Sequence, residues 1–155
     1  MSTSTGLSLL DNSLAIPEVR LKRKEAVLQE LVGRLREAGA LGDADLLLDV
    51  LLMRERLGST AMGKGVALPN ARSIAVTEPR LVVARSSRGV EWRAPDDLPV
   101  HLVFLVLSPA EWSIDMHHDQ LSRAAGFARL QRNRQRLIDA PNATSMSALV
   151  REIGS

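Results

Sequence analysis

The residues with the clearest capacity for chemistry lie between positions 54 and 72. Gly58, Gly63 and Gly65 fall within eight residues, so the backbone there can turn tightly and come close to a bound group. The same stretch carries hydroxyl and guanidinium groups, on Ser59, Thr60, Arg54 and Arg72. Such groups donate hydrogen bonds to phosphate and carboxylate oxygens, which predicts an anion site. A glycine-rich connection between a helix and a strand would have the same composition, and the spacing alone leaves both interpretations open.

The second group of candidate residues is the histidine pair His117 and His118. Both lie in a segment with helical periodicity, where adjacent side chains diverge by about 100°, so only one imidazole can face a shared pocket. Consecutive ligands on a helix do not converge on a metal, and adding Asp119 and His101 gives no zinc spacing. We therefore expect no metal and no cofactor.

The composition excludes several other chemistries. The 155 residues include no cysteine, which removes thiol nucleophiles, disulfides and cysteine-ligated metals. The formal net charge is only +2, and aromatic residues make up 3%, with no tyrosine to form a stacking surface for nucleic-acid bases. A late basic cluster comprises Arg123, Arg129, Arg132, Arg134 and Arg136. It is either a solvated face or a docking surface for an acidic partner, and without a groove-reading motif we expect no nucleic-acid partner.

The length and the hydrophobic content of 45% predict one domain over residues 15–155, preceded by a loose segment at 1–14. The longest apolar run, residues 100–107, is too short to span a bilayer. The first 17 residues lack the basic region of a secretory signal. We therefore expect a cytoplasmic protein with no membrane partner.

The elements that must position these residues follow from periodicity and turn signals. Helices are expected at 21–38, from an N-cap at Asp43 to about 56, at 114–131, at 134–139, and from a Thr144 or Ser145 cap to 153. Strands are expected at 66–68, 80–84, 90–92 and 100–107. The last strand is apolar on both faces, which indicates a central strand covered by helices on two sides. Lys24 should face solvent, and Trp92 should be half-buried. The element order indicates an α+β sandwich.

The glycine-rich stretch also resembles the signature of a known family, the enzyme IIA domain of the bacterial phosphoenolpyruvate-dependent phosphotransferase system. The similarity is to the fructose/mannitol type, which includes the nitrogen-regulatory single-domain proteins. The matching positions are Arg54-Glu55, Leu57-Gly58-Ser59-Thr60, Gly63, Gly65-Val66-Ala67, Pro69 and Ala71-Arg72. Later blocks around Trp92, at 99–104 and at 117–122 extend the resemblance over roughly residues 15 to 153. It implies a three-layer α/β/α sandwich with a mixed central sheet.

In that family, the histidine directly after the signature proline accepts a phosphoryl group from the phosphocarrier HPr or its nitrogen-branch relative. Asn70 occupies this position here. An amide nitrogen is delocalised into its carbonyl and has no lone pair to attack phosphorus. The resemblance also implies that Arg54 is the phosphate-orienting arginine and that His117 is the second active-site histidine, which leaves His118 solvated. A surface ion pair of Arg54 with Glu55 or Asp49 is the alternative.

Three functions remain open from the sequence. The first is a regulatory module that binds an HPr-like phosphocarrier or a regulatory target protein and cannot accept phosphate. The second is an active phosphotransfer protein in which Asn70 is an introduced substitution or another residue is the acceptor. The third is a sensor that binds a small anion through Arg54, Thr60 and Arg72. The free-standing length favours the nitrogen-regulatory branch over the sugar branch.

Overall fold

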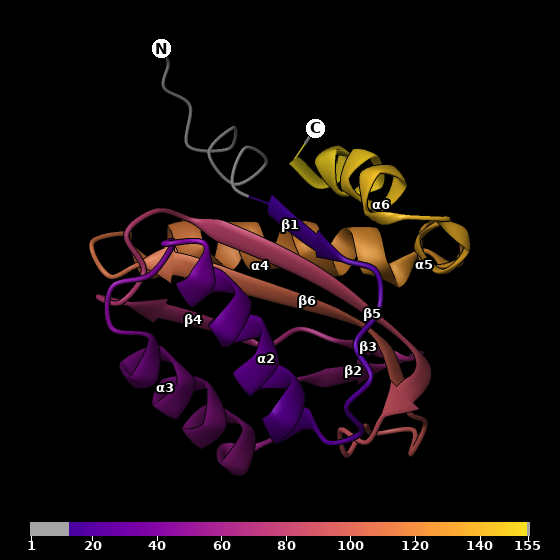
Figure 1. The fold of residues 1–155 in the computed structure, drawn as a ribbon, viewed down its shortest axis with the longest axis horizontal. Helices are drawn as coiled ribbons and strands as arrows, with labels where there is room; N and C mark the ends of the chain where they lie inside the picture. Colours follow the sequence, from indigo (N-terminus) through magenta and orange to yellow (C-terminus); the bar gives the residue numbers. More distant parts are fainter. Residues whose placement is uncertain (1–12, 155) are drawn as a thin grey trace.

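A mixed β-sheet with helices on both faces organises residues 13–154, which are the residues that the computed structural model describes (Figure 1). The strands are β1 (Ser13–Ile16), β2 (Ala61–Gly63), β3 (Val66–Ala67), β4 (Asn70–Ser73), β5 (Arg80–Val90) and β6 (Val100–Pro109). The helices are α2 (Lys24–Glu37), α3 (Ala44–Leu57), α4 (Ile114–Arg129), α5 (Gln131–Asp139), α6 (Ala143–Val150) and the 3-10 helix η1 (Arg151–Gly154). No helix in this part of the chain has the length and apolar character needed to cross a membrane.

Strand β6 lies at the centre of the sheet. It pairs antiparallel with β5 on one side, and β1 extends that side as a parallel neighbour of β5. On its other side β6 pairs in parallel with β3 and then, further along, with β4. The carboxyl ends of β4 and β6 therefore lie next to each other, close to the start of α4. The expected central strand is confirmed.

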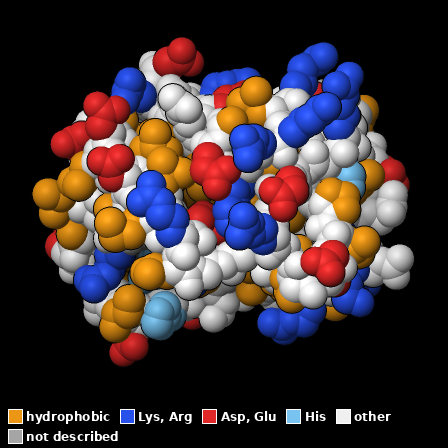
Figure 2. Space-filling view, turned by 90° about the horizontal axis from the view of Figure 1, so that it is seen from below, with side chains coloured by type: hydrophobic (Ala, Val, Ile, Leu, Met, Phe, Trp, Pro, Cys, Tyr) orange, Lys and Arg blue, Asp and Glu red, His pale blue; other side chains and the backbone are white. Residues whose placement is uncertain are grey.

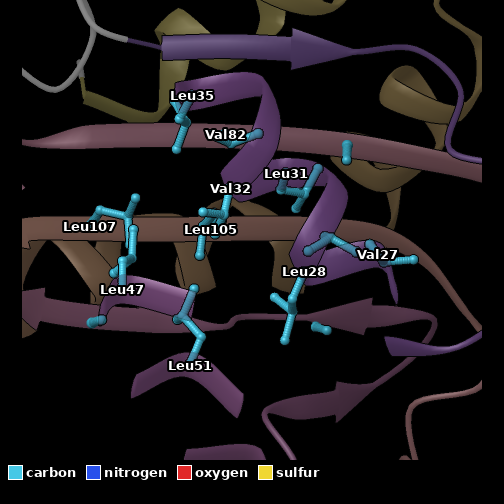
Figure 3. Packing of buried hydrophobic residues seen from close by; sticks show 14 of the residues in the cluster. Val27, Leu28, Leu31, Val32, Leu35, Leu47, Leu51, Val82, Leu105 and Leu107 are labelled. Carbon is cyan, nitrogen blue, oxygen red and sulfur yellow. The ribbon is translucent and has the colours of Figure 1, made fainter. Parts of the chain in front are cut away.

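Alternating side chains of β5 and β6 build two hydrophobic cores, one on each face of the sheet. Val82, Leu105 and Leu107 face α2 and α3, where they meet the apolar stripe of α2 and two leucines of α3 (Figure 3). Leu81, Phe104 and Val106 face α4, α5 and α6. This two-sided burial explains why the run at 100–107 lacks the polar alternation of a strand with one wet face. The result is the expected three-layer arrangement with a mixed sheet.

Short strands, helix ends and the length of β5 account for the differences from the sequence expectations. The strands expected at 80–84 and 90–92 are one strand, β5, which ends at Val90. Strands β1, β2 and β4 were not predicted, because each has at most four residues and its conformation depends on pairing with a distant strand. Ser13 and Leu14 belong to β1, so the expected loose segment at 1–14 is not loose at its end, and residues 1–12 lie outside the described part. The N-cap of α6 is Asn142, whose side chain accepts a hydrogen bond from the backbone N–H of Ser145.

Candidate functional site

Three elements bring Asn70, Ser108 and His117 together. Asn70 is the first residue of β4, Ser108 lies near the end of β6, and His117 lies in the first turn of α4. Pro69 separates β4 from β3, and its carbonyl accepts a hydrogen bond of 3.0 Å from Val106 of β6. This hydrogen bond keeps the chain beside β6 at the break between β3 and β4. Asn70 is thereby held in register beside the centre of the sheet.

A chain of hydrogen bonds connects these side chains. The Nδ2 of Asn70 donates to the carbonyl of Leu68 at 2.9 Å, and its Oδ1 lies 3.0 Å from the Nε2 of His117. The Nδ1 of His117 lies 2.7 Å from the Oγ of Ser108. A carbonyl can only accept, so the amide group of Asn70 must face Leu68 with its nitrogen. Its oxygen then accepts from Nε2–H, which leaves Nδ1 to accept from the Ser108 hydroxyl. In the neutral imidazole, this assignment places the proton on Nε2.

The surroundings of His117 favour the same neutral form. His117 is 3% exposed, whereas His118 is exposed, as the helical divergence predicts. Burial lowers the pKa of His117 below its ordinary value of 6.5, and the positive charges of His118 and Arg72 lower it further. At neutral pH the imidazole is therefore uncharged, with one nitrogen donating and the other accepting.

This burial predicts a pH dependence of stability. The unfolded chain takes up the proton of His117 near its ordinary pKa of 6.5, whereas the folded protein takes it up only at lower pH. The contribution of the uncharged His117 to the free energy of unfolding is fully present above pH 6.5. It is lost as the pH falls through the pKa that His117 has in the folded protein. Urea unfolding between pH 7 and 5 should therefore show a steeper loss for the unchanged protein than for His117→Gln. His118→Gln is the comparison: it removes one charge that lowers the pKa of His117 but leaves the ring buried, so its loss should lie between those of the other two proteins. Equal slopes for all three proteins would contradict the assignment.

The two arginines of the sequence motif act on backbone carbonyls. Arg72 lies two residues after Asn70 on β4, and its Nη1 donates to the carbonyls of Ala110 and Trp112 at 3.2 and 2.8 Å. These bonds fix the loop between β6 and α4, and so the start of the helix that carries His117. Arg54 donates to the carbonyl of Gly58 at 2.9 Å, which satisfies the C-terminal end of α3. Within the described residues Arg54 forms neither the ion pair considered from the sequence nor a hydrogen bond with Asn70.

The hydroxyl groups of Ser59 and Thr60 are used inside the protein. Thr60 donates its hydroxyl and its backbone N–H to the buried carboxylate of Glu55, and it accepts from the indole N–H of Trp92. Ser59 donates to the carbonyl of Trp92 at 2.8 Å. Lys24 completes this cluster through an ion pair of 3.2 Å with Glu55. Trp92 is 1% exposed and Lys24 is 7% exposed, so the expectations of a half-buried tryptophan and a solvated lysine were wrong.

Gly63 and Gly65 lie at the tight turn between β2 and β3, apart from both the Asn70 site and the Glu55 cluster. Both have positive φ, and a Cβ on Gly63 or Gly65 would meet Asp96 or Pro99 and His101 rather than the Asn70 site. The residues predicted to form one pocket therefore lie in three separate parts of the structure.

Ser108 is a site residue that the sequence analysis did not predict. The signal available for it was a hydroxyl side chain at the end of an apolar strand, directly before a proline. Among residues 13–154 no group of three acidic or histidine side chains could hold a metal ion.

Comparisons with known proteins identify the family. Residues 8–153 match the family described as "Phosphoenolpyruvate-dependent sugar phosphotransferase system, EIIA 2". The chain is 32% identical over 154 residues to the PTS system fructose-specific EIIA component of Haloferax volcanii, covering 99% of this chain and 96% of that protein. It is 31% identical over 134 residues to the fructose-specific EIIABC component of Bacillus subtilis, covering 86% of this chain but only 21% of that protein.

The structural similarity extends to a nitrogen-regulatory relative. The crystal structure of the nitrogen regulatory protein IIA-Ntr from Neisseria meningitidis superimposes with a TM-score of 0.79 at 29% identity, over 97% of this chain and 98% of that one. The family match covers nearly all of the chain, including β4, the end of β6 and the start of α4. The protein therefore belongs to the EIIA type 2 family of the phosphoenolpyruvate-dependent sugar phosphotransferase system.

Proposed function

We propose that this protein is an EIIA-type regulatory module that binds partner proteins without accepting a phosphoryl group. The observation that carries the proposal is Asn70 at the position where the family resemblance implies the acceptor histidine. A phosphoryl acceptor needs a lone pair that can approach phosphorus. The amide nitrogen of Asn70 has none to offer, and one of its two hydrogens is donated to the carbonyl of Leu68.

The hydrogen-bond chain also argues against His117 as a replacement acceptor. Its Nε2 carries the proton that Asn70 accepts, and the lone pair of its Nδ1 is occupied by the hydroxyl of Ser108. Both ring nitrogens therefore have partners within the site, and the ring is buried. Phosphorylation of His117 would require breaking one of these bonds and opening the packing around the ring. This cost supports the regulatory module over an active phosphotransfer protein.

A hydrophobic surface at the site end of the molecule supports the binding role. Figure 2 shows hydrophobic side chains gathered at its left-hand end, which corresponds to the end of Figure 1 where β4 ends and α4 begins. Ile74 directly after β4 is 77% exposed, and Ile114, the first residue of α4, is 47% exposed. Large apolar side chains this exposed are typical of a surface that a partner covers. The proposed partner is an HPr-like phosphocarrier or a regulatory target, with the nitrogen-regulatory branch favoured.

A titration with HPr and with its nitrogen-branch relative tests this surface. Amide shifts of the labelled protein should concentrate around Ile74 and the start of α4. Ile74→Glu should weaken binding at least about tenfold, because a charge replaces a buried apolar contact. The control is Leu98→Glu, an exposed leucine near the start of β6, which should leave binding unchanged. Equal effects of the two substitutions, or shifts centred elsewhere, would contradict the assigned surface.

A further inference from the structure

A second hollow lies toward the other end of β6 from the Asn70 site. A cavity of about 630 Å³ is bordered by Leu102 near the start of β6, by residues 85–87 of β5 and by one face of α5. Leu102 precedes Val106, the partner of Asn70, by four residues, or about 13 Å along an extended strand. The volume is in the range of sites for small organic molecules and exceeds what a single inorganic ion needs.

The charged side chains around this cavity are mainly cationic. Lys64, Arg85 and Arg134 line it, against the single carboxylate of Glu18. That carboxylate already accepts hydrogen bonds from the backbone N–H and the hydroxyl of Ser87, at 3.2 and 3.0 Å. The negative charge of Glu18 is thus hydrogen-bonded to β5, which forms part of the cavity wall. The positive charges of the three cationic side chains favour binding of an anion.

The two arginines are held rigidly, with donors left over. Arg85 donates through Nε to the carbonyl of Pro17 and through Nη1 to the carbonyls of residues 137, 138 and 140. Arg134 donates through Nη1 to the carbonyls of residues 128 and 129. Within residues 13–154 the Nη2 of each guanidinium forms no hydrogen bond. Lys64 likewise forms no ion pair with the described residues. Fixed guanidinium groups with unused N–H donors are well suited to carboxylate or phosphate oxygens.

The start of α5 adds to the positive potential. Gln131, its first residue, lines the cavity, and no side chain caps this end of the helix. The unsatisfied N–H groups of a helix N-terminus carry a partial positive charge that attracts anions. Leu102 and Ile138 supply apolar surface in the same cavity, which suits a carbon skeleton. The cavity thus combines cations, free donors and apolar contact.

We propose that this cavity binds a small organic anion that carries carboxylate or phosphate groups, at a place separate from Asn70 and His117. The location differs from the anion site expected from the sequence: none of Arg54, Arg72 and Thr60 lines this cavity, and the hydroxyl of Thr60 donates to Glu55. The proposal does not depend on whether the protein accepts a phosphoryl group.

Titrations with citrate and with 3-phosphoglycerate test it, at constant ionic strength, by calorimetry and amide shifts. The expected result is saturable millimolar or tighter binding, with the largest shifts at Gly65, Ser86 and Gln131. No saturable binding of either probe, or shifts centred on Asn70 and His117, would overturn the proposal.

Two substitutions separate this site from a general charge effect. Lys64→Gln removes an exposed charge and should raise the Kd about five- to tenfold. Gln131→Glu places a carboxylate at a helix N-terminus, which favours the helix but repels an anion, so the Kd should rise more than about tenfold without loss of stability. Arg34→Gln, on α2 across the sheet, is the control and should leave the Kd within about twofold. A comparable loss in Arg34→Gln and Lys64→Gln would contradict a built site.

Discussion

Replacing Asn70 by histidine is expected to turn the protein into a phosphoryl acceptor. The Nδ1 of a histidine branches from the same carbon as the amide nitrogen of Asn70, so it can donate to the carbonyl of Leu68 in the same way. Its Nε2 then carries the free lone pair that asparagine lacks. That lone pair attacks the phosphorus of a phosphorylated HPr-like carrier as the phosphorus–nitrogen bond of the carrier breaks. Incubation with phosphoenolpyruvate, enzyme I and the carrier should convert most molecules of Asn70→His to a singly phosphorylated form by intact mass.

The matched control for this gain is Asn70→Gln, which changes the side chain but keeps an amide. It should remain unmodified under the same conditions. A second control, Ile74→Glu in the Asn70→His background, should slow the modification if the hydrophobic surface after β4 docks the carrier. Failure of Asn70→His to react while it still binds the carrier would mean that the pocket has lost more than its acceptor.

The second large effect is expected from Lys24→Met. Lys24 and Glu55 form a buried ion pair, with side chains 8% and 3% exposed, and Glu55 also holds both polar groups of Thr60. Removing the lysine leaves a buried carboxylate without a cation, which costs about 3–5 kcal/mol. The free energy of unfolding from urea titration should fall by that amount. The loop at 58–60 should loosen at the same time, because Glu55 orders it.

An exposed pair provides the comparison for this loss. Arg36 and Asp45 are bonded at 2.7 Å, with side chains 59% and 86% exposed, so Arg36→Met should cost less than about 1 kcal/mol. A similar small change in Lys24→Met would show that the buried pair does not hold the α2–α3 face together.

The sequence predicts the large elements well because their patterns are local or extreme. The apolar run of β6 requires burial on two faces, and the periodicity of α2, α3 and α4 specifies helices whose observed ends differ by only a few residues. The glycine-rich motif and its family resemblance predict that Asn70 and His117 lie together, and the structure places Oδ1 of Asn70 3.0 Å from Nε2 of His117.

The remaining features depend on partners that are distant in the chain. Lys24 is solvated in any isolated amphipathic helix and becomes buried only because Glu55 of α3 lies opposite. The hydroxyls of Ser59 and Thr60 suggest an anion site until Trp92 and Glu55 are placed beside them. Strand β4 has weak strand propensity and exists because β6 pairs with it. Such features become visible only when the tertiary contacts are known.

The most direct test of the central claim is the intact mass of the unchanged protein after incubation with phosphoenolpyruvate, enzyme I and either HPr or its nitrogen-branch relative. The Asn70→His protein in a parallel reaction shows that the components are active. We predict that the unchanged chain keeps its original mass while the variant gains one phosphoryl group. An acid-labile phosphoryl group on the unchanged chain would contradict the account and would direct the search for the acceptor to His117.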